Sequence, residues 1–353
     1  MPSTTIVSEL DGNAFTIALR KHESRERTAM PGPTVDLARE VISPDEPSVT
    51  ADFIAFLKSA SAARHPTGTI RRFNQARASG CVEAEFNVVT GLADELKVGL
   101  FEEPRRYSAW IRFANATSAS DREKDVRGMS IKVRGVPGDN LMPGIDVQDF
   151  VLNSHPVMMV PGPGEFLELL RAVEAGGWRR ASYFLAHPRA ARIAFASRQQ
   201  PSSHLDIPYW STTPYLFGDG RAVKYIVRPV SRAHHRPPTV TDTYLHDELN
   251  RRLATEDVAL DFYVQLQRDA RTMPIEDASA EWSERDSPYA RVAEVRIPRQ
   301  SIDVPGREQV CERTAFNPWH ALAAHRPLGA MNRVRRAIYE AMQEFRESHA
   351  ART

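Results

Sequence analysis

The chain has 353 residues, of which 46 are lysine or arginine and 45 are aspartate or glutamate, so its formal net charge is +1. Charges this closely balanced exclude a general electrostatic attraction to nucleic acid or to anionic membranes. The length is enough to bury a large core, in one big domain or in two ordinary ones.

The first 48 residues show no sustained hydrophobic period and carry Pro31-Gly32-Pro33 and Pro44. This composition predicts an extended N-terminal arm over residues 1–48, which wraps the body of the protein or a partner subunit of a homo-oligomer. The remaining residues, 49–353, are expected to form one domain. It begins with a short amphipathic helix between Ser48 and Ala63.

Four alternating segments follow. Between residues 82 and 88 apolar and polar side chains alternate strictly, which is the period-two pattern of a strand with one buried face. The same pattern predicts strands over residues 107–115, 128–134 and 147–153. Four successive strands with short links indicate an antiparallel meander that can close into a barrel.

The middle of the chain is predicted to be helical, over residues 164–175, 178–187 and 190–197, and to cover one side of the sheet. Strands are then predicted over residues 215–217, 222–227, 258–268 and 291–297, and a charged helix over 241–254. About eight strands, with helices in the middle and at the end, predict an α+β fold with a large antiparallel β-barrel.

Few features indicate a compartment. Residues 1–11 lack a basic region followed by an apolar core, and no stretch approaches the length of a membrane span, so we expect a cytoplasmic protein. The two cysteines, Cys81 and Cys311, have neither metal-ligand nor redox spacing. We interpret both as buried thiols rather than as a disulfide.

A last helix is predicted over residues 332–346, after the breaker Pro327-Leu328-Gly329. On this helix Arg335 lies one turn from Tyr339, and Arg346 follows on the same face. The nearby cation favours phenolate over phenol, and a phenolate can hold a haem iron from the proximal side. Taken alone, the pair is more simply an exposed contact on an amphipathic helix.

Other segments change that interpretation, because five of them resemble catalase motifs in order and in spacing. The five segments are Arg72–Val88, Ser108–Asn115, Asp125–Val133, Asp149–Met159 (followed by Phe166) and Arg335-x-x-x-Tyr339. The chain is therefore similar to the catalase family over roughly residues 65–350. The resemblance implies a catalase-like barrel, haem b as cofactor, and a peroxide or other small molecule as substrate.

The resemblance also implies roles for individual residues. Tyr339 corresponds to the axial iron ligand, and Arg335 supports it. Arg72, Arg112 and Arg346 correspond to the partners of the haem propionates, since carboxylates in a low-dielectric pocket need fixed cations. Two further residues have counterparts around the haem: Phe166 against the porphyrin and Asn153 at the distal oxygen. Taken one at a time, the same residues can also be interpreted as surface arginines, a core phenylalanine and a strand-end asparagine without any role at a haem.

The distal side departs from the family pattern, because Gln75 stands where catalases have the catalytic histidine. An amide can orient a ligand but cannot cycle a proton near neutral pH, so efficient dismutation of hydrogen peroxide is not expected. A slip of one residue would place Asn74 there with the same consequence. His155, two residues after Asn153, is a displaced base in a less favoured interpretation.

Three functions remain open. The favoured one is a haem-dependent oxidoreductase that acts on an organic or lipid hydroperoxide, or on another small substrate, without a strong distal base. The second is a small catalase or peroxidase that degrades hydrogen peroxide. The third is a non-enzymatic haem-binding protein. An empty barrel is disfavoured, because the arginines would then be buried charges without partners.

Overall fold

The structure is a computed structural model, and it describes residues 37–68, 70–231 and 241–350. Most of the predicted N-terminal arm therefore lies outside the described residues. The first helix, α1, spans Glu46–Arg64, two residues earlier than expected, with Pro47 in its first turn. Proline is favoured there because its missing N–H has no partner in a helix. No helix among the described residues is long and apolar enough to cross a membrane.

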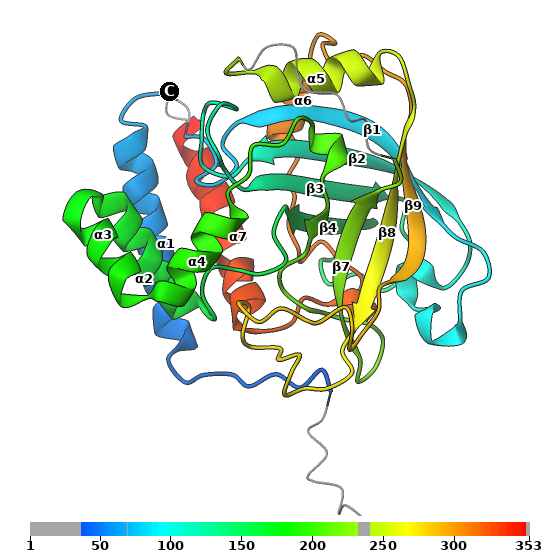
Figure 1. Ribbon diagram of the computed structural model, residues 1–353, viewed down its shortest axis with the longest axis horizontal. Helices are drawn as coiled ribbons and strands as arrows, with labels where there is room; N and C mark the ends of the chain where they lie inside the picture. The colour runs from blue at the N-terminus through cyan, green and yellow to red at the C-terminus, as the bar shows by residue number, and fades with distance from the viewer. Residues whose placement is uncertain (1–36, 69, 232–240, 351–353) are drawn as a thin grey trace, which may run out of the picture. The chain divides into compact units, whose positions relative to one another are not determined.

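Among the residues that the structure describes, nine strands form one antiparallel sheet (Figure 1). They are β1 Ala78–Val88, β2 Arg106–Asn115, β3 Arg127–Arg134, β4 Val147–Asn153, β5 Tyr209–Trp210, β6 Tyr215–Leu216, β7 Ala222–Pro229, β8 Val258–Leu266 and β9 Ala290–Ile297. The order is β5-β4-β3-β2-β1-β9-β8-β7-β6, and a further pairing of β5 with β7 closes eight strands into a barrel. The predicted α+β fold with a barrel of about eight strands is confirmed.

The alternation in the sequence is explained by this barrel. On β2 the inward side chains Ala109, Ile111 and Phe113 are at most 1% exposed and join the main hydrophobic core. Rings from other strands fill the interior, and Phe86, Phe150 and Phe262 lie within 5.8 Å of one another by ring centroids. The side chains of β2 that alternate with these point out of the barrel, and this outward row can therefore line a site on the outer face of the barrel.

Seven helices accompany the barrel in the described part of the chain. After α1 they are α2 Pro163–Ala175, α3 Gly177–Ala186, α4 Pro188–Ser197, α5 Tyr244–Leu253, α6 Arg307–Arg313 and α7 Ala330–Ala350. Short 3-10 helices lie at Asp94–Leu96, Gly99–Phe101, His204–Asp206 and Ala323–His325. The sequence did not predict α6 or the two-residue strand β5, which is too short to show a period.

Helices α1 to α4 and α7 lie together beside the barrel (Figure 1). A second hydrophobic cluster joins three of them, with Phe53 and Leu57 from α1, Leu167 from α2, and Val334 and Met342 from α7. The predicted helices α2, α3 and α4 are present, and they lie beside the barrel together with α1 and α7. This side of the barrel is the one toward which the outward row of β2 points.

The start of α7 is fixed by a charged network. Arg333 makes ion pairs with Glu40 at 2.6 Å, Glu46 at 2.7 Å and Glu276 at 3.1 Å. Gly329, just before the helix, has a φ of +86°, and a Cβ there would lie 2.5 Å from the Ile275 carbonyl oxygen. Only glycine suits such a position, so the direction in which α7 leaves this turn is strongly constrained.

The cysteines differ from the expectation. Cys81 on β1 and Cys311 on α6 form a disulfide, with Cα atoms 5.8 Å apart, so the interpretation as two buried thiols is wrong. The sequence could not reveal the pair, because 230 positions separate the two residues and α6 was not foreseen. The bond attaches α6 to the barrel wall beside the cavity described next.

Candidate functional site

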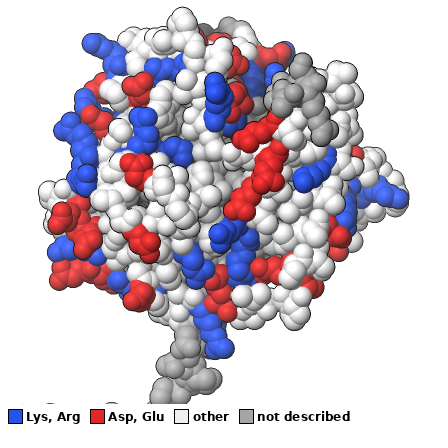
Figure 2. All heavy atoms as spheres, turned by 180° about the vertical axis from the view of Figure 1, so that it is seen from behind, with Lys and Arg blue, Asp and Glu red and all other residues white. Residues whose placement is uncertain are grey.

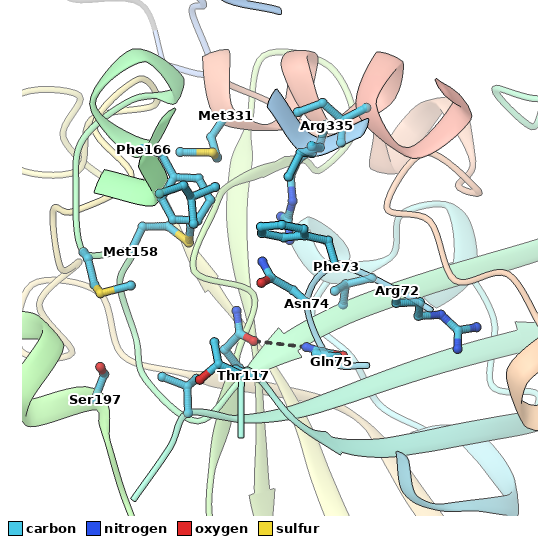
Figure 3. A pocket seen from close by; sticks show the side chains of 18 of the residues that line it. Arg72, Phe73, Asn74, Gln75, Thr117, Met158, Phe166, Ser197, Met331 and Arg335 are labelled. Atoms are coloured by element: carbon cyan, nitrogen blue, oxygen red, sulfur yellow. Dashed lines mark hydrogen bonds between the residues drawn. The ribbon is translucent and has the colours of Figure 1, made fainter. Parts of the chain in front are cut away.

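A cavity of about 730 Å³ lies between the barrel and helices α1, α2, α4 and α7 (Figure 3). Its volume is in the range of sites for small molecules and cofactors. All eight residues that the sequence indicated line this one cavity: Arg72, Gln75, Arg112, Asn153, Phe166, Arg335, Tyr339 and Arg346. They come from positions between 72 and 346 of the sequence, and the fold brings them together.

The barrel contributes a row of outward side chains. Cys81 pairs with Arg112 across β1 and β2, Arg112 pairs with Ser130 across β2 and β3, and Ser130 pairs with Val151 across β3 and β4. Directly paired residues point to the same face of a sheet. Arg112 is therefore placed in the cavity wall by the same alternation that buries Phe113 in the barrel.

Three arginines and one glutamate form a charged cluster. Arg112 is only 2% exposed, and burial followed by the charge of nearby Arg72 lowers its pKa to about 10. Burial and Arg72 also lower the pKa of Arg346. Glu312, on α6, accepts from Arg72 at 2.6 Å and from Arg112 at 3.3 Å. Glu312 was not predicted from the sequence, because its only signal was its position next to Cys311.

Arg335 and Tyr339 extend from α7. The guanidinium carbon of Arg335 lies 6.0 Å from the centre of the Tyr339 ring, as the four-residue spacing predicted. Arg335 also donates to Asn332 Oδ1 at 3.4 Å, and buried Asn332 is itself held by the Pro214 and Leu328 carbonyls. Figure 3 shows Arg335 directed from α7 toward the segment that carries Phe73 and Asn74.

Gln75 lies against the barrel in an unusual backbone conformation, with a φ of +55°. Two hydrogen bonds hold it there: its N–H donates to the Ala116 carbonyl at 2.7 Å, and its carbonyl accepts from Arg112 at 2.7 Å. Its side-chain amide donates weakly to Asn153 Oδ1 at 3.5 Å, the dashed line in Figure 3. The position of the Gln75 amide beside the cavity is therefore set mainly by the two backbone hydrogen bonds. The hydrogen bond made by the amide itself contributes less.

Asn74 and His155 also line the cavity, so both residues that sequence analysis weighed as alternatives are close to it. In Figure 3 the Asn74 amide points into the space below Arg335. Burial lowers the pKa of His155, so the imidazole is neutral at pH 7. A neutral imidazole can accept a proton, but burial makes it a weaker base than an exposed histidine.

Apolar side chains make up much of the remaining wall. Met158, Met331 and Phe166 line the cavity to the left of Arg335 in Figure 3, and Phe53 of α1 packs edge-on against Phe166 at 5.9 Å. Helix α4 adds Phe195, which is 85% exposed at the mouth. Met331 and Phe195 were not predicted from the sequence, since nothing in their spacing separates them from ordinary core residues.

No group of three or more His, Cys, Asp or Glu residues suited to a metal ion occurs in the described part of the chain. The candidate metal ligand in this cavity is a tyrosine, which lies outside that set of residue types. Charge on the outer surface is mixed, and Figure 2 shows one face on which basic and acidic side chains are interspersed. The cavity wall therefore differs from the outer surface, because arginines are clustered in it.

Comparison with known proteins identifies the fold. No family model and no curated protein sequence matches the chain. Among solved structures, catalase A from Saccharomyces cerevisiae matches with a TM-score of 0.64 and 17% identity over 81% of this chain and 62% of that one. A fungal catalase gives 0.62 and 15% over 81% and 61%, and a bacterial catalase gives 0.62 and 13% over 97% and 67%.

The chain therefore has the catalase fold, as its motifs predicted. It spans about 61–62% of the length of the fungal and yeast catalases that it matches. At 13–17% identity the likeness concerns the fold. What the cavity does has to be argued from its own residues.

Proposed function

We propose that the cavity binds haem b, with Tyr339 as the axial iron ligand, and that the protein converts an organic hydroperoxide. The observation that carries the proposal is the convergence of Tyr339, Arg335 and the three arginines Arg72, Arg112 and Arg346 on one cavity of about 730 Å³. Clustered cations beside an apolar cavity fit an apolar molecule that bears carboxylates.

The residues present fit this group. Arg112 Nε is buried and has no hydrogen-bond partner among the described residues, which leaves a donor for an acidic group of the ligand. Phe166, Met158 and Met331 offer the apolar surface that a porphyrin face needs. Haem would supply the redox-active iron that peroxide cleavage requires, and Tyr339 would make that iron electron-rich.

We infer the substrate preference from the side of the cavity that carries Gln75, Asn74 and Asn153, here called the distal wall. Gln75, Asn74 and Asn153 offer amides, which orient an oxygen by hydrogen bonds but carry no proton between its two oxygen atoms at pH 7. His155 is neutral and lies in the same wall. A hydroperoxide with an apolar substituent would gain binding energy from the methionines and phenylalanines, whereas hydrogen peroxide would gain none.

Absorption spectroscopy tests this proposal. The purified protein is reconstituted with haem, and its spectrum is recorded before and after addition of hydrogen peroxide or of cumene hydroperoxide. We expect a ferric-phenolate spectrum, consumption of cumene hydroperoxide, and little oxygen release from hydrogen peroxide. Vigorous oxygen release would instead identify a working catalase, and failure to take up haem would exclude the proposed chemistry.

The axial ligand is tested by Tyr339→Phe, with Tyr263→Phe on β8 as the matched control. Phenylalanine keeps the ring but has no oxygen, so the phenolate bands should be lost and haem affinity should fall. The Tyr263 variant should keep both, because Tyr263 lies outside the cavity and its hydroxyl contacts Asp261. An unchanged spectrum in the Tyr339 variant would contradict the assignment.

A further inference from the structure

Glu312 approaches the arginines from outside the cavity. It pairs with Arg72 and Arg112, and its charge also acts on Arg346, yet it is not among the residues that line the cavity. Arg72 donates in addition to the Glu312 and Thr314 carbonyls, both at 3.0 Å. The carboxylate is therefore part of a layer behind the arginines.

Several contacts hold Glu312 in this place. The preceding residue, Cys311, is joined by the disulfide to Cys81, and Cys81 is the cross-strand neighbour of Arg112. At the other end of α6, Arg307 donates to Gln300 at 2.8 Å and lies over the Trp110 ring at 5.4 Å. A seven-residue helix attached at both ends keeps one carboxylate beside two guanidinium groups.

The charge balance of the cluster indicates that Glu312 acts as a counter-ion to the arginines. Arg72, Arg112 and Arg346 carry three positive charges close together, and burial, followed by the charge of Arg72, lowers the pKa values of Arg112 and Arg346. Without a counter-ion, an empty cavity would hold these cations at a large cost in free energy. Glu312 reduces the positive charge to two, and a ligand with two carboxylates neutralises the rest.

We propose that Glu312 is a resident counter-ion that stabilises the cluster when the cavity is empty and lowers its affinity for the carboxylates of a ligand. This inference rests on the proposed haem site but concerns a residue outside it. Glu312 and a ligand carboxylate are like charges acting on the same arginines. Each therefore weakens the contribution of the other, and the effect is reciprocal.

The test compares Glu312→Gln with Glu308→Gln, an exposed glutamate on the same helix. Glutamine keeps the shape of Glu312 and an oxygen acceptor for Arg72 but removes the charge. Melting temperatures are measured on ligand-free protein. Dissociation constants are measured for ferric protoporphyrin IX and for its dimethyl ester, which lacks the two carboxylates.

We expect the Glu312 variant to melt at a lower temperature when empty and to bind ferric protoporphyrin IX about fivefold more tightly, because a repulsion at a partly exposed site is removed. Its affinity for the dimethyl ester should equal that of the wild type. The Glu308 variant should match the wild type in all three measurements. Unchanged or weaker binding of ferric protoporphyrin IX to the Glu312 variant would overturn the proposal.

A second arm separates this inference from the proposed function. If the wild type binds neither porphyrin, the haem assignment fails, and melting temperatures in sodium phosphate and in sodium chloride at equal ionic strength decide about Glu312. Phosphate should then stabilise the Glu312 variant more than it stabilises the wild type, because a free anion replaces the missing counter-ion. An equal effect of phosphate on both proteins would overturn the proposal.

Discussion

The side chain of Gln75 lies directly on Gly128 of the neighbouring strand β3. A Cβ built on Gly128 would come within 2.3 Å of Gln75 Nε2 and 2.6 Å of its amide carbon. Any residue other than glycine at position 128 would therefore displace the Gln75 amide. Gly128 pairs with Asn153 across β3 and β4, so the glycine also affects the spacing between the Gln75 and Asn153 amides.

Gly128→Ala should therefore displace the Gln75 amide while the fold persists. The clash is with the end of a flexible side chain, so we expect a change in melting temperature within about 2 °C. A crystal structure of the variant should show Gln75 turned away from Asn153. Gly164→Ala on α2 is the control, because nothing lies within 4 Å of a Cβ there. A Gln75 amide still in its original place would contradict the prediction.

Gln75→His tests whether the lack of a base at position 75 limits the turnover of hydrogen peroxide. Histidine is among the residues that tolerate a positive φ, so the backbone at +55° can accept it. A base at this position should raise the turnover of hydrogen peroxide by the haem-loaded protein by about 10²-fold, the usual range for acid–base catalysis. Oxygen release measured with an electrode checks this increase.

The matched variant is Asn74→His, one residue earlier. If the distal position belongs to Gln75, only the Gln75 variant should gain activity. If the gain appears in the Asn74 variant alone, the distal residue is Asn74, whose amide points into the cavity in Figure 3. Both variants must carry haem and must show wild-type melting, so that a loss of folding is not read as a lack of chemistry.

The sequence was sufficient for those parts of the site that lie on regular elements. Alternation on β2 placed Arg112 on one face and Phe113 on the other, and the helical period of α7 aligned Arg335 with Tyr339. Both periods are short-range and depend on the geometry of a single element. The catalase motifs then indicated which elements face the same cavity.

Long-range features were not accessible in this way. The pairing of Cys81 with Cys311 spans 230 positions, and it is one of the contacts that hold α6, and with it Glu312, beside Arg72. A seven-residue helix between loops gives too little periodicity to be recognised. The distance between an arginine and its counter-ion depends on the packing of the whole chain.

The disulfide should contribute strongly to stability. It closes a loop of 230 residues, and a cross-link of this kind removes entropy from the unfolded chain, which is typically worth roughly 2–5 kcal/mol. The double variant Cys81→Ser/Cys311→Ser should melt well below the wild type. Reducing agent should lower the wild-type melting temperature and leave that of the double variant unchanged. Equal melting of oxidised wild type and double variant would count against the bond.

A last prediction concerns pH and the start of α7. Burial alone would raise the pKa of Glu40, but hydrogen bonds from the Gly329 backbone and from Arg326 and Arg333 outweigh it, and the pKa is lowered from 4.5. A carboxylate with a lowered pKa in the folded state stabilises the fold fully above its unfolded pKa. It loses that contribution as the pH falls through the folded value.

Glu40→Gln should therefore melt below the wild type at pH 7, and the difference should shrink as the pH falls from 5 to 3. Melting temperatures measured in this range provide the check, and exposed Glu102→Gln is the control, which should follow the wild type throughout. A difference that stays constant from pH 7 to pH 3 would show that the Glu40 charge does not contribute. In that case the start of α7 would depend on Arg333 and its other partners, Glu46 and Glu276.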